Sequence, residues 1–138
     1  MISRILNGVQ MENLKIKGTN RSPDIFFDYE NNLLEIKGKS YSANISEYYT
    51  PVFLWLGQYL GQLENQHCTV NIELAYFNSS SSKVLLEFFL LLEEAVNQGK
   101  NISVNWIYDE EDEDNREYGE EFQEELEALP FNLIQKQA

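Results

Sequence analysis

The sequence is poor in the residues that form disulfides, metal sites and nucleic-acid surfaces. It contains one cysteine, Cys68, and one histidine, His67, so an internal disulfide is excluded and a zinc site of Cys and His is not expected. Bases are scarce too: 10 Lys and Arg stand against 23 Asp and Glu, for a formal charge of −13. Such a chain repels phosphate backbones and anionic membrane surfaces. We therefore expect no metal, no cofactor and no nucleic-acid partner.

Long hydrophobic runs are also missing. No window approaches the roughly 20 apolar residues that cross a bilayer. The N-terminal Met-Ile-Ser-Arg-Ile-Leu-Asn-Gly lacks the apolar core of an export signal. We expect a protein that is neither exported nor inserted into a membrane, and the lone cysteine fits the reducing cytoplasm.

What the chain does contain is enough apolar material for a core. Hydrophobic residues make up 43% and aromatic residues 13% of the sequence, which is too much for a disordered chain. At this length we expect one domain over 1–138, with its core at about 14–134. The acids are concentrated, because the stretch 109–127 holds twelve of them and one base, Arg116. Its first part, about 109–116, is predicted to be a mobile acidic loop.

Hydrophobic periodicity predicts a mixed α/β sheet of five or six strands. The predicted elements are, in chain order, a β-hairpin (24–28 and 33–37), a helix (44–63), a strand (69–76), a helix (81–98), a strand (102–108), a helix (117–129) and an edge strand (131–134). Pro51, with Thr50 as a cap, predicts a kink or restart in the first helix, and Gly99 predicts the end of the second. The order ββαβαβα(β) makes the two central strands parallel neighbours.

The inward faces of two helices follow from the same spacing. The residues expected to face the sheet are Val84, Leu85, Phe88 and Leu92 in the second helix, and Tyr118, Phe122, Leu126 and Leu129 in the third.

Two groups of polar residues carry no site. An EF-hand that began at Asp109 would need glycine at its sixth position, which is Asp114, so tight calcium binding is not expected. His67 and Cys68 are adjacent, and on a strand they would face opposite sides and form no nucleophile–base pair. We expect Cys68 in the core and His67 in a loop or at a strand edge.

The serine turn, Asn78-Ser79-Ser80-Ser81-Ser82, is the most informative segment. It could be only a solvated connection whose first hydroxyl caps the following helix. Yet a hydroxyl at a helix N-terminus lies beside unpaired backbone N–H groups and the positive end of the helix dipole. A phosphate there would gain donors and add about −1.5 to −2 of charge to a neutral surface. Ser79 is the best candidate phosphoacceptor, with Ser80 and Ser81 next.

The segment from Leu74 to Lys83 (Leu-Ala-Tyr-Phe-Asn-Ser-Ser-Ser-Ser-Lys) closely resembles the signature of the SiaC family of bacterial regulatory phosphoproteins. Other blocks resemble the same family: Ser22-Pro23, Gly38-Lys39-Ser40-Tyr41 followed by Asn44, Tyr49 with Pro51 and Trp55, Val104-Asn105-Trp106 with Tyr108-Asp109, and Glu117-Tyr118-Gly119-Glu120-Glu121-Phe122. The resemblance covers about residues 14–134.

The resemblance implies a fold similar to STAS-type anti-sigma-factor antagonists and a function in signalling. Members are phosphorylated on the turn by a partner kinase, and a PP2C-type phosphatase reverses the modification. The unphosphorylated form binds and activates a diguanylate cyclase, which raises cyclic-di-GMP and favours biofilm growth. Ser79 matches the acceptor. The implied partner-binding residues are Asn78, Ser79, Ser80, Ser81, Lys83, Tyr41 and Asn44.

The chain departs from the family pattern in two places. The acceptor is Ser79 instead of Thr, which keeps the hydroxyl and loses the methyl group. Ser42-Ala43 stands where the family tends to carry Pro-Glu before Asn44, so this loop is expected to contact its partner differently.

Three function classes are open on the sequence alone: a phosphorylation switch, a constitutive acidic binding module, and a small enzyme with a carboxylate or serine site. No glycine-rich phosphate loop, nucleophile elbow or His-Glu metal motif occurs, so we do not expect an enzyme. A deep apolar pocket would favour the enzyme. A flat surface around the serine turn would favour the switch, and a contact surface confined to 109–127 the acidic module.

Overall fold

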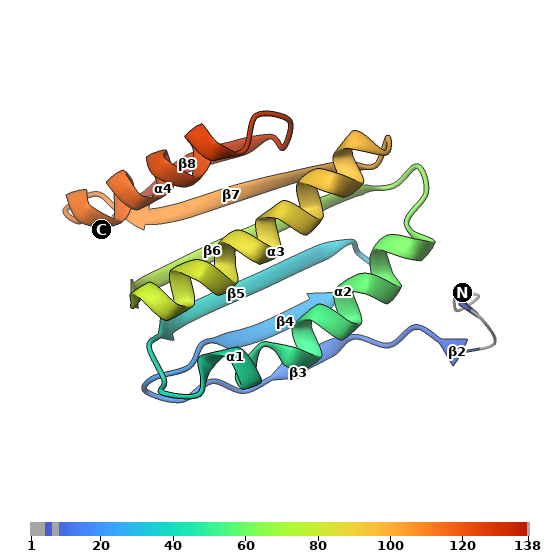
Figure 1. The fold of residues 1–138 in the computed structure, drawn as a ribbon, viewed down its shortest axis with the longest axis horizontal. Coiled ribbons are helices and arrows are strands. Elements are labelled where there is room, and N and C mark those ends of the chain that lie inside the picture. Colours follow the sequence, from blue (N-terminus) through green and yellow to red (C-terminus); the bar gives the residue numbers. More distant parts are fainter. Residues whose placement is uncertain (1–4, 7–8, 138) are drawn as a thin grey trace.

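The computed structural model describes residues 5–6 and 9–137, and it is built around one six-stranded sheet (Figure 1). Its strands lie in the spatial order β3 (Leu14–Ile16), β4 (Asp24–Asp28), β5 (Leu33–Ser40), β6 (His67–Phe77), β7 (Asn101–Asp109) and β8 (Phe131–Lys136). The first three pair antiparallel, and β5 to β8 pair in parallel. Two short strands, β1 (Ile5–Leu6) and β2 (Val9–Gln10), form a separate antiparallel pair.

Helices cover one face of the sheet, as Figure 1 shows. They are α1 (Ile45–Tyr48), α2 (Thr50–Gln62), α3 (Ser79–Asn97) and α4 (Glu113–Glu125). Parallel neighbours need a crossover, and here each crossover contains a helix: α1 and α2 lead to β6, α3 to β7 and α4 to β8. In the part of the chain described, no helix is both long and apolar enough to cross a membrane.

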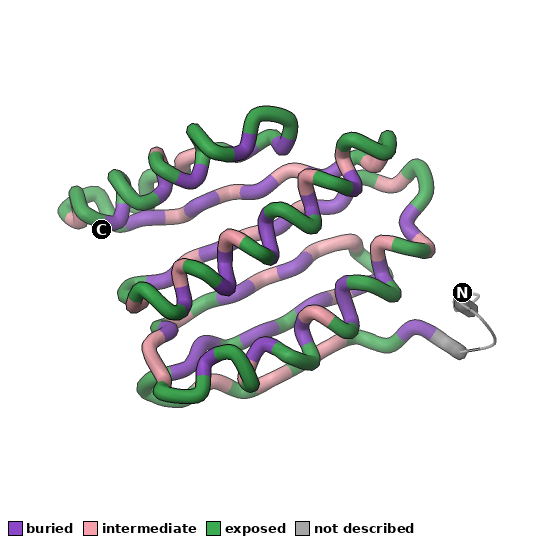
Figure 2. Tube along the Cα trace, viewed as in Figure 1, coloured by how far each residue is buried: buried purple, intermediate pink, exposed green. Residues whose placement is uncertain are grey.

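The core lies between the sheet and this helix layer. Strand residues alternate between the two faces, so one side of each strand is apolar and buried. On β6 and β7 the buried residues are Cys68, Val70, Ile72, Leu74, Ile102, Val104, Trp106 and Tyr108. Figure 2 shows the buried stripes of the helices turned toward the strands and their exposed sides turned away.

The opposite face of the sheet is polar along its centre. Asn71, Asn105 and Asn132 stand in register on β6, β7 and β8. Asn105 Nδ2 donates to Asn71 Oδ1 at 2.9 Å, and Asn132 Nδ2 donates to Asn105 Oδ1 at 3.2 Å. These hydrogen bonds pair the amide groups with one another on the face of the sheet that the helices do not cover.

Most of the predicted architecture is confirmed. The hairpin, the parallel central strands and the edge strand are all present, and β3 adds one strand before the hairpin. The helix restarts as predicted, because α1 ends at Tyr48 and α2 carries Pro51 in its first turn. Thr50 is the first residue of α2 and not its cap, a position held by Tyr49. Gly99, with φ +100°, follows the end of α3.

The acidic segment differs from the prediction. We predicted a loop over about 109–116 and a helix over 117–129, but α4 spans Glu113–Glu125. The reason is a cap: Asp112 Oδ1 accepts a hydrogen bond from the backbone N–H of Asn115 at 3.0 Å. Acidic residues in the first turn are also stabilised by the helix dipole. The run of acids therefore starts a helix.

The inward face of α4 is shifted as well. Tyr118 was expected to face the sheet, yet its side chain is 47% exposed, while Phe122 is buried as predicted. The contact is made by Gly119, where an added Cβ would lie 2.5 Å from Trp106 Cδ1. Because only glycine fits there, α4 approaches the sheet closely and Tyr118 lies beside the contact, with its ring 5.1 Å from that of Phe77.

Candidate functional site: the serine turn at the start of α3

The serine turn forms the beginning of α3, directly after β6. Asn78 is the N-cap, with extended backbone (φ −96°, ψ 178°), and its Oδ1 accepts a hydrogen bond from Ser81 N at 2.9 Å. This geometry satisfies one of the free N–H groups at the helix start. The hypothesis that Ser79 serves only as the cap is therefore wrong, because Asn78 performs that function and Ser79 is the first helical residue.

Ser79 and Ser80 are exposed in the first turn of α3. No acidic residue lies in this turn, so the turn itself carries no charge that opposes the helix dipole. A negative group attached to either hydroxyl would meet the positive end of a 19-residue helix. The turn can therefore accept charge without losing its cap.

Ser81 differs from its neighbours because it is fully buried. Its Oγ donates to the backbone oxygen of Ser40 at 2.5 Å and lies 2.8 Å from Ser40 Oγ. Ser40 Oγ is in turn 3.2 Å from the hydroxyl of Tyr49. These contacts form a buried hydroxyl chain that joins α3, the end of β5 and the junction between α1 and α2.

The pKa of Tyr49 reflects the burial of these hydroxyl groups. Burial raises the pKa of Tyr49 to about 12, against a smaller lowering by its hydrogen bond with Ser40. The residues Ser40 and Tyr49 were missed as site residues, although both stand in blocks that resemble the SiaC family. Their side chains support the turn from inside and are not available to a partner.

The other predicted partner-binding residues surround the turn to different extents. Tyr41 packs edge-on against Tyr76, which stands two residues before Asn78, and their ring centroids are 5.3 Å apart. Lys83 is exposed on α3, one helical turn beyond Ser79. Asn44 is exposed just before α1, and its own N–H donates to Ser42 Oγ at 3.3 Å. The fold thus brings Tyr41 and Lys83 to the turn and leaves Asn44 beside α1.

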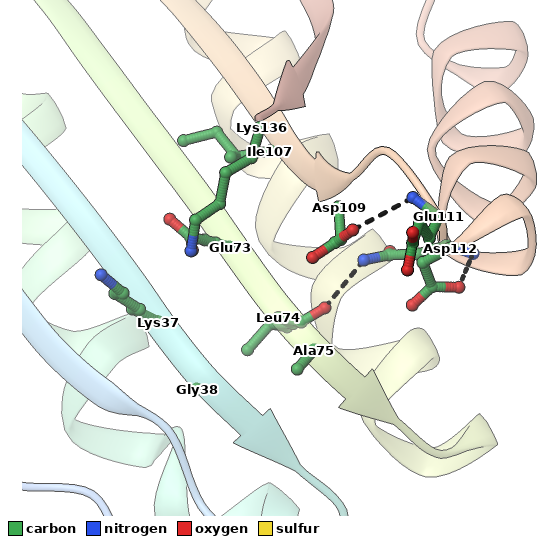
Figure 3. Close-up of a pocket in the computed structure, with 11 residues that line it drawn as sticks. Lys37, Gly38, Glu73, Leu74, Ala75, Ile107, Asp109, Glu111, Asp112 and Lys136 are labelled. Carbon is green, nitrogen blue, oxygen red and sulfur yellow. Dashed lines mark hydrogen bonds and ion pairs between the residues drawn. The ribbon is translucent and has the colours of Figure 1, made fainter. Parts of the chain in front are cut away.

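A cavity of about 500 Å³ lies outside the serine turn, at the carboxyl ends of β5, β6 and β7 (Figure 3). Its walls include Lys37, Glu73, Asp109, Glu111, Asp112 and Lys136, so six of its eleven lining residues are charged. Lys136 Nζ donates to Glu73 Oε2 at 2.8 Å, and this bond raises the pKa of Lys136. A typical small-molecule site is lined mainly by hydrophobic and aromatic side chains, whereas charged side chains are the majority here.

The remaining reactive side chains are held by structural contacts. His67 is exposed at the first position of β6, with Nδ1 2.8 Å from Asn101 Oδ1 and Nε2 3.0 Å from Ser103 Oγ. Cys68 is buried as predicted, and burial raises its pKa to about 11. Within the described residues, no group of three His, Cys, Asp or Glu side chains is arranged to hold a metal ion.

Comparison with known proteins identifies relatives that span nearly the whole chain. The family model described as "SiaC family regulatory phosphoprotein" matches residues 16–136. An uncharacterized protein of Pseudomonas aeruginosa (strain UCBPP-PA14) is 34% identical over 123 residues, which are 89% of this chain and 96% of that protein.

Solved structures agree with this match. Apo-SiaC from Pseudomonas aeruginosa superimposes with a TM-score of 0.81 at 33% identity, over 90% of this chain and 99% of that one. A chain in the crystal structure of the diguanylate cyclase SiaD in complex with its activator SiaC, from the same species, gives 0.83 at 32% identity over 89% and 99%. The resemblance, the fold and these matches agree, and the chain belongs to the SiaC family of regulatory phosphoproteins.

Proposed function

We propose that this chain is a non-enzymatic signalling protein whose binding to an effector is controlled by reversible phosphorylation of Ser79. The observation that carries the proposal is the geometry of the turn. Ser79 is exposed at the first position of α3, beside a neutral first turn whose cap is supplied by Asn78. A phosphate on this hydroxyl changes the surface charge by nearly two units and leaves the fold intact.

The choice among the three serines follows from their exposure. Ser81 is a poor acceptor because its hydroxyl is buried and hydrogen-bonded to Ser40. Ser79 and Ser80 are both exposed, and Ser79 is the residue that matches the family's acceptor. Ser80 is the second candidate.

The partners we propose are a cognate protein kinase, a PP2C-type phosphatase and a diguanylate cyclase. The cyclase is supported by the similar chain that is crystallised with SiaD as its activator. Under this proposal the unphosphorylated chain activates the cyclase in the cytoplasm and thereby controls cyclic-di-GMP and biofilm growth. Phosphorylation weakens the contact because a doubly charged group is added to the surface that the cyclase covers.

A constitutive acidic module is the alternative. The surface it would use is α4, whose exposed residues are largely acidic. In that case a change of charge at Ser79 would not affect binding.

The test compares two added charges on the same helix. Ser79→Asp places a carboxylate at the start of α3, and Asn97→Asp places one at its exposed last residue. We expect Ser79→Asp to weaken binding to the organism's own diguanylate cyclase by about tenfold in calorimetric titration, and Asn97→Asp to change it less than about twofold. Equal affinities for Ser79→Asp and the wild type would support the constitutive module.

A further inference from the structure

We infer that two adjoining hollows between the end of β6 and the start of α4 bind a small compound that carries both a guanidinium group and a carboxylate, such as free arginine. The larger hollow is the charged cavity of Figure 3. The smaller one, of about 150 Å³, has a lining that includes three aromatic residues, two acids and an amide: Tyr76, Phe77, Tyr118, Asp112, Asp114 and Asn115. Asp112 and Asn115 line both hollows, so the two adjoin. Ser79 lines neither hollow, and the site goes beyond the proposed function.

An unpaired buried acceptor lies where the hollows meet. Asn115 is 6% exposed, and its Nδ2 donates to the backbone oxygen of Leu74 at 3.0 Å, which leaves Oδ1 as an acceptor. In the described part of the chain, this Oδ1 is the one buried side-chain nitrogen or oxygen without a hydrogen-bond partner. Native proteins pair such atoms, because a buried polar group that has lost its water is costly. A ligand in the hollows that supplies an N–H donor would satisfy this oxygen.

The charges near Asn115 favour a cationic donor. Asp112 and Asp114 line the smaller hollow, and no described residue that lines it is basic. Figure 3 shows Asp109 and Glu111 on the same side of the larger hollow as Asp112. Asp109 Oδ1 accepts from the N–H of Glu111 and Asp112 Oδ1 from that of Asn115, each at 3.0 Å. The second oxygen of each carboxylate is left to accept from a ligand.

The aromatic residues select a guanidinium group among the cations. Tyr76 and Tyr118 are 54% and 47% exposed, and the ring of Phe77 lies 5.1 Å from that of Tyr118. A guanidinium is planar, stacks on aromatic rings and has five N–H donors for carboxylates and for Asn115 Oδ1. A quaternary ammonium group would have no N–H to donate. A volume of about 150 Å³ suffices for this group, since a cavity of that size holds a benzene ring.

The larger hollow determines the other end of the ligand. Figure 3 shows Lys37 and Lys136 on the side away from Glu111 and Asp112. Lys136 already donates to Glu73, whereas Lys37 is exposed on β5 and can pair with a carboxylate of the ligand. A volume of about 500 Å³ is in the range of small-molecule sites, and the carboxyl ends of parallel strands are where α/β sheets bind their ligands.

The experiment is a titration of the unphosphorylated full chain with free arginine, followed by heteronuclear NMR at the side-chain amide of Asn115. We expect these signals to shift and to saturate in the millimolar range, which is usual for a ligand of about twelve non-hydrogen atoms. Citrulline has the same length and a neutral group in place of the guanidinium, so it should bind at least about tenfold more weakly. Equal binding of arginine and citrulline would overturn the inference.

A matched pair of variants tests the location. Asp114→Asn removes one carboxylate from the smaller hollow, and Glu124→Gln makes the same change on α4 outside both hollows. Both residues are exposed and neither caps α4, a function of Asp112, so both variants are expected to fold. We expect Asp114→Asn to weaken arginine binding about fivefold and Glu124→Gln less than about twofold. The same affinity in both variants would contradict the site.

A third probe separates a free compound from an arginine residue of another protein. N-acetylarginine amide keeps the guanidinium group and lacks the free carboxylate, so we expect it to bind several-fold more weakly than arginine. Equal affinity would overturn the assignment to a small compound and indicate a protein side chain. None of these measurements uses a kinase, a cyclase or a phosphate. Failure of arginine to bind would therefore leave the proposed function of Ser79 standing, and failure of Ser79 phosphorylation would leave this site standing.

Discussion

The starts of α3 and α4 are built alike and charged differently. Each helix follows a parallel strand, and in each a side chain at the N-cap accepts from the N–H three residues on: Asn78 from Ser81, and Asp112 from Asn115. The first turn of α3 holds serines, whereas that of α4 already holds two acids. The dipole of α4 is thus permanently matched by negative charge, and that of α3 is not.

This difference is why we propose the start of α3, and not that of α4, as the switch. A phosphate on α3 would create a new interaction, while added charge at α4 would meet acids that are already there. The two starts are also fixed to the sheet by different means. Gly119 lets α4 approach Trp106 closely, and Ser81 ties α3 to β5 through the buried hydroxyl chain. If this comparison is right, α3 is fixed to the core by buried contacts, while the charge of its exposed first turn can change without loss of stability.

The largest expected effect concerns the anchor of α3 in the core. Phe88 is 1% exposed, with its ring centroid 6.1 Å from that of Phe27. Phe88→Ala should lower the free energy of unfolding by about 3–5 kcal/mol, as large-to-small changes in a core do. Phe26→Ala is the control, since Phe26 is 37% exposed. A loss below about 1 kcal/mol for Phe88→Ala in chemical denaturation would show that α3 is not anchored there.

The second-largest expected effect is a loss of stability at alkaline pH, where Tyr49 of the buried hydroxyl chain ionises. The pKa of Tyr49 is raised from 10.0 to about 12, mainly by burial. Between these values the unfolded state has lost the tyrosine proton and the folded state retains it, so stability falls as pH rises. A difference of about two pKa units corresponds to about 2–3 kcal/mol.

The check is a comparison of unfolding free energies for the wild type and Tyr49→Phe from pH 9 to 12. We expect the two curves to run parallel below pH 10. Above pH 10, the unfolding free energy of the wild type should fall more steeply than that of Tyr49→Phe. Parallel curves over the whole range would mean that Tyr49 ionises normally in the folded protein.

The smallest effect separates two serines of the same turn. Ser81→Ala removes the donor to Ser40 and should cost about 1–3 kcal/mol, because buried polar atoms lose their partner. Ser79→Ala removes an exposed hydroxyl that does not cap the helix and should cost less than about 0.5 kcal/mol. If Ser79→Ala were the more destabilising of the two, the comparison of the two helix starts would have to be redrawn.

Sequence periodicity predicted the fold well where one side of an element is buried. The strand over 69–76 and the helix over 81–98 were both found within a few residues of their observed ends. The start of α4 was not, because a run of acids looks like a solvated loop until the cap at Asp112 is recognised.

The geometry of the candidate site was predictable in part. Ser79 was selected from its position after a strand and from the family resemblance, and its place at the first position of α3 agrees with that choice. The roles of Asn78 and Ser81 were not predictable, since four consecutive serines give no pattern that separates buried from exposed hydroxyls. That distinction depends on Ser40, which is 41 residues away in the chain.

The central claim is that Ser79 is the residue the cognate kinase modifies, and intact-mass spectrometry after incubation with kinase and ATP tests it most directly. We predict that the wild type and Ser80→Ala each gain one phosphate and that Ser79→Ala gains none. A Ser79→Ala protein that still gains one phosphate would contradict the account, and a wild type that gains none would contradict the switch itself.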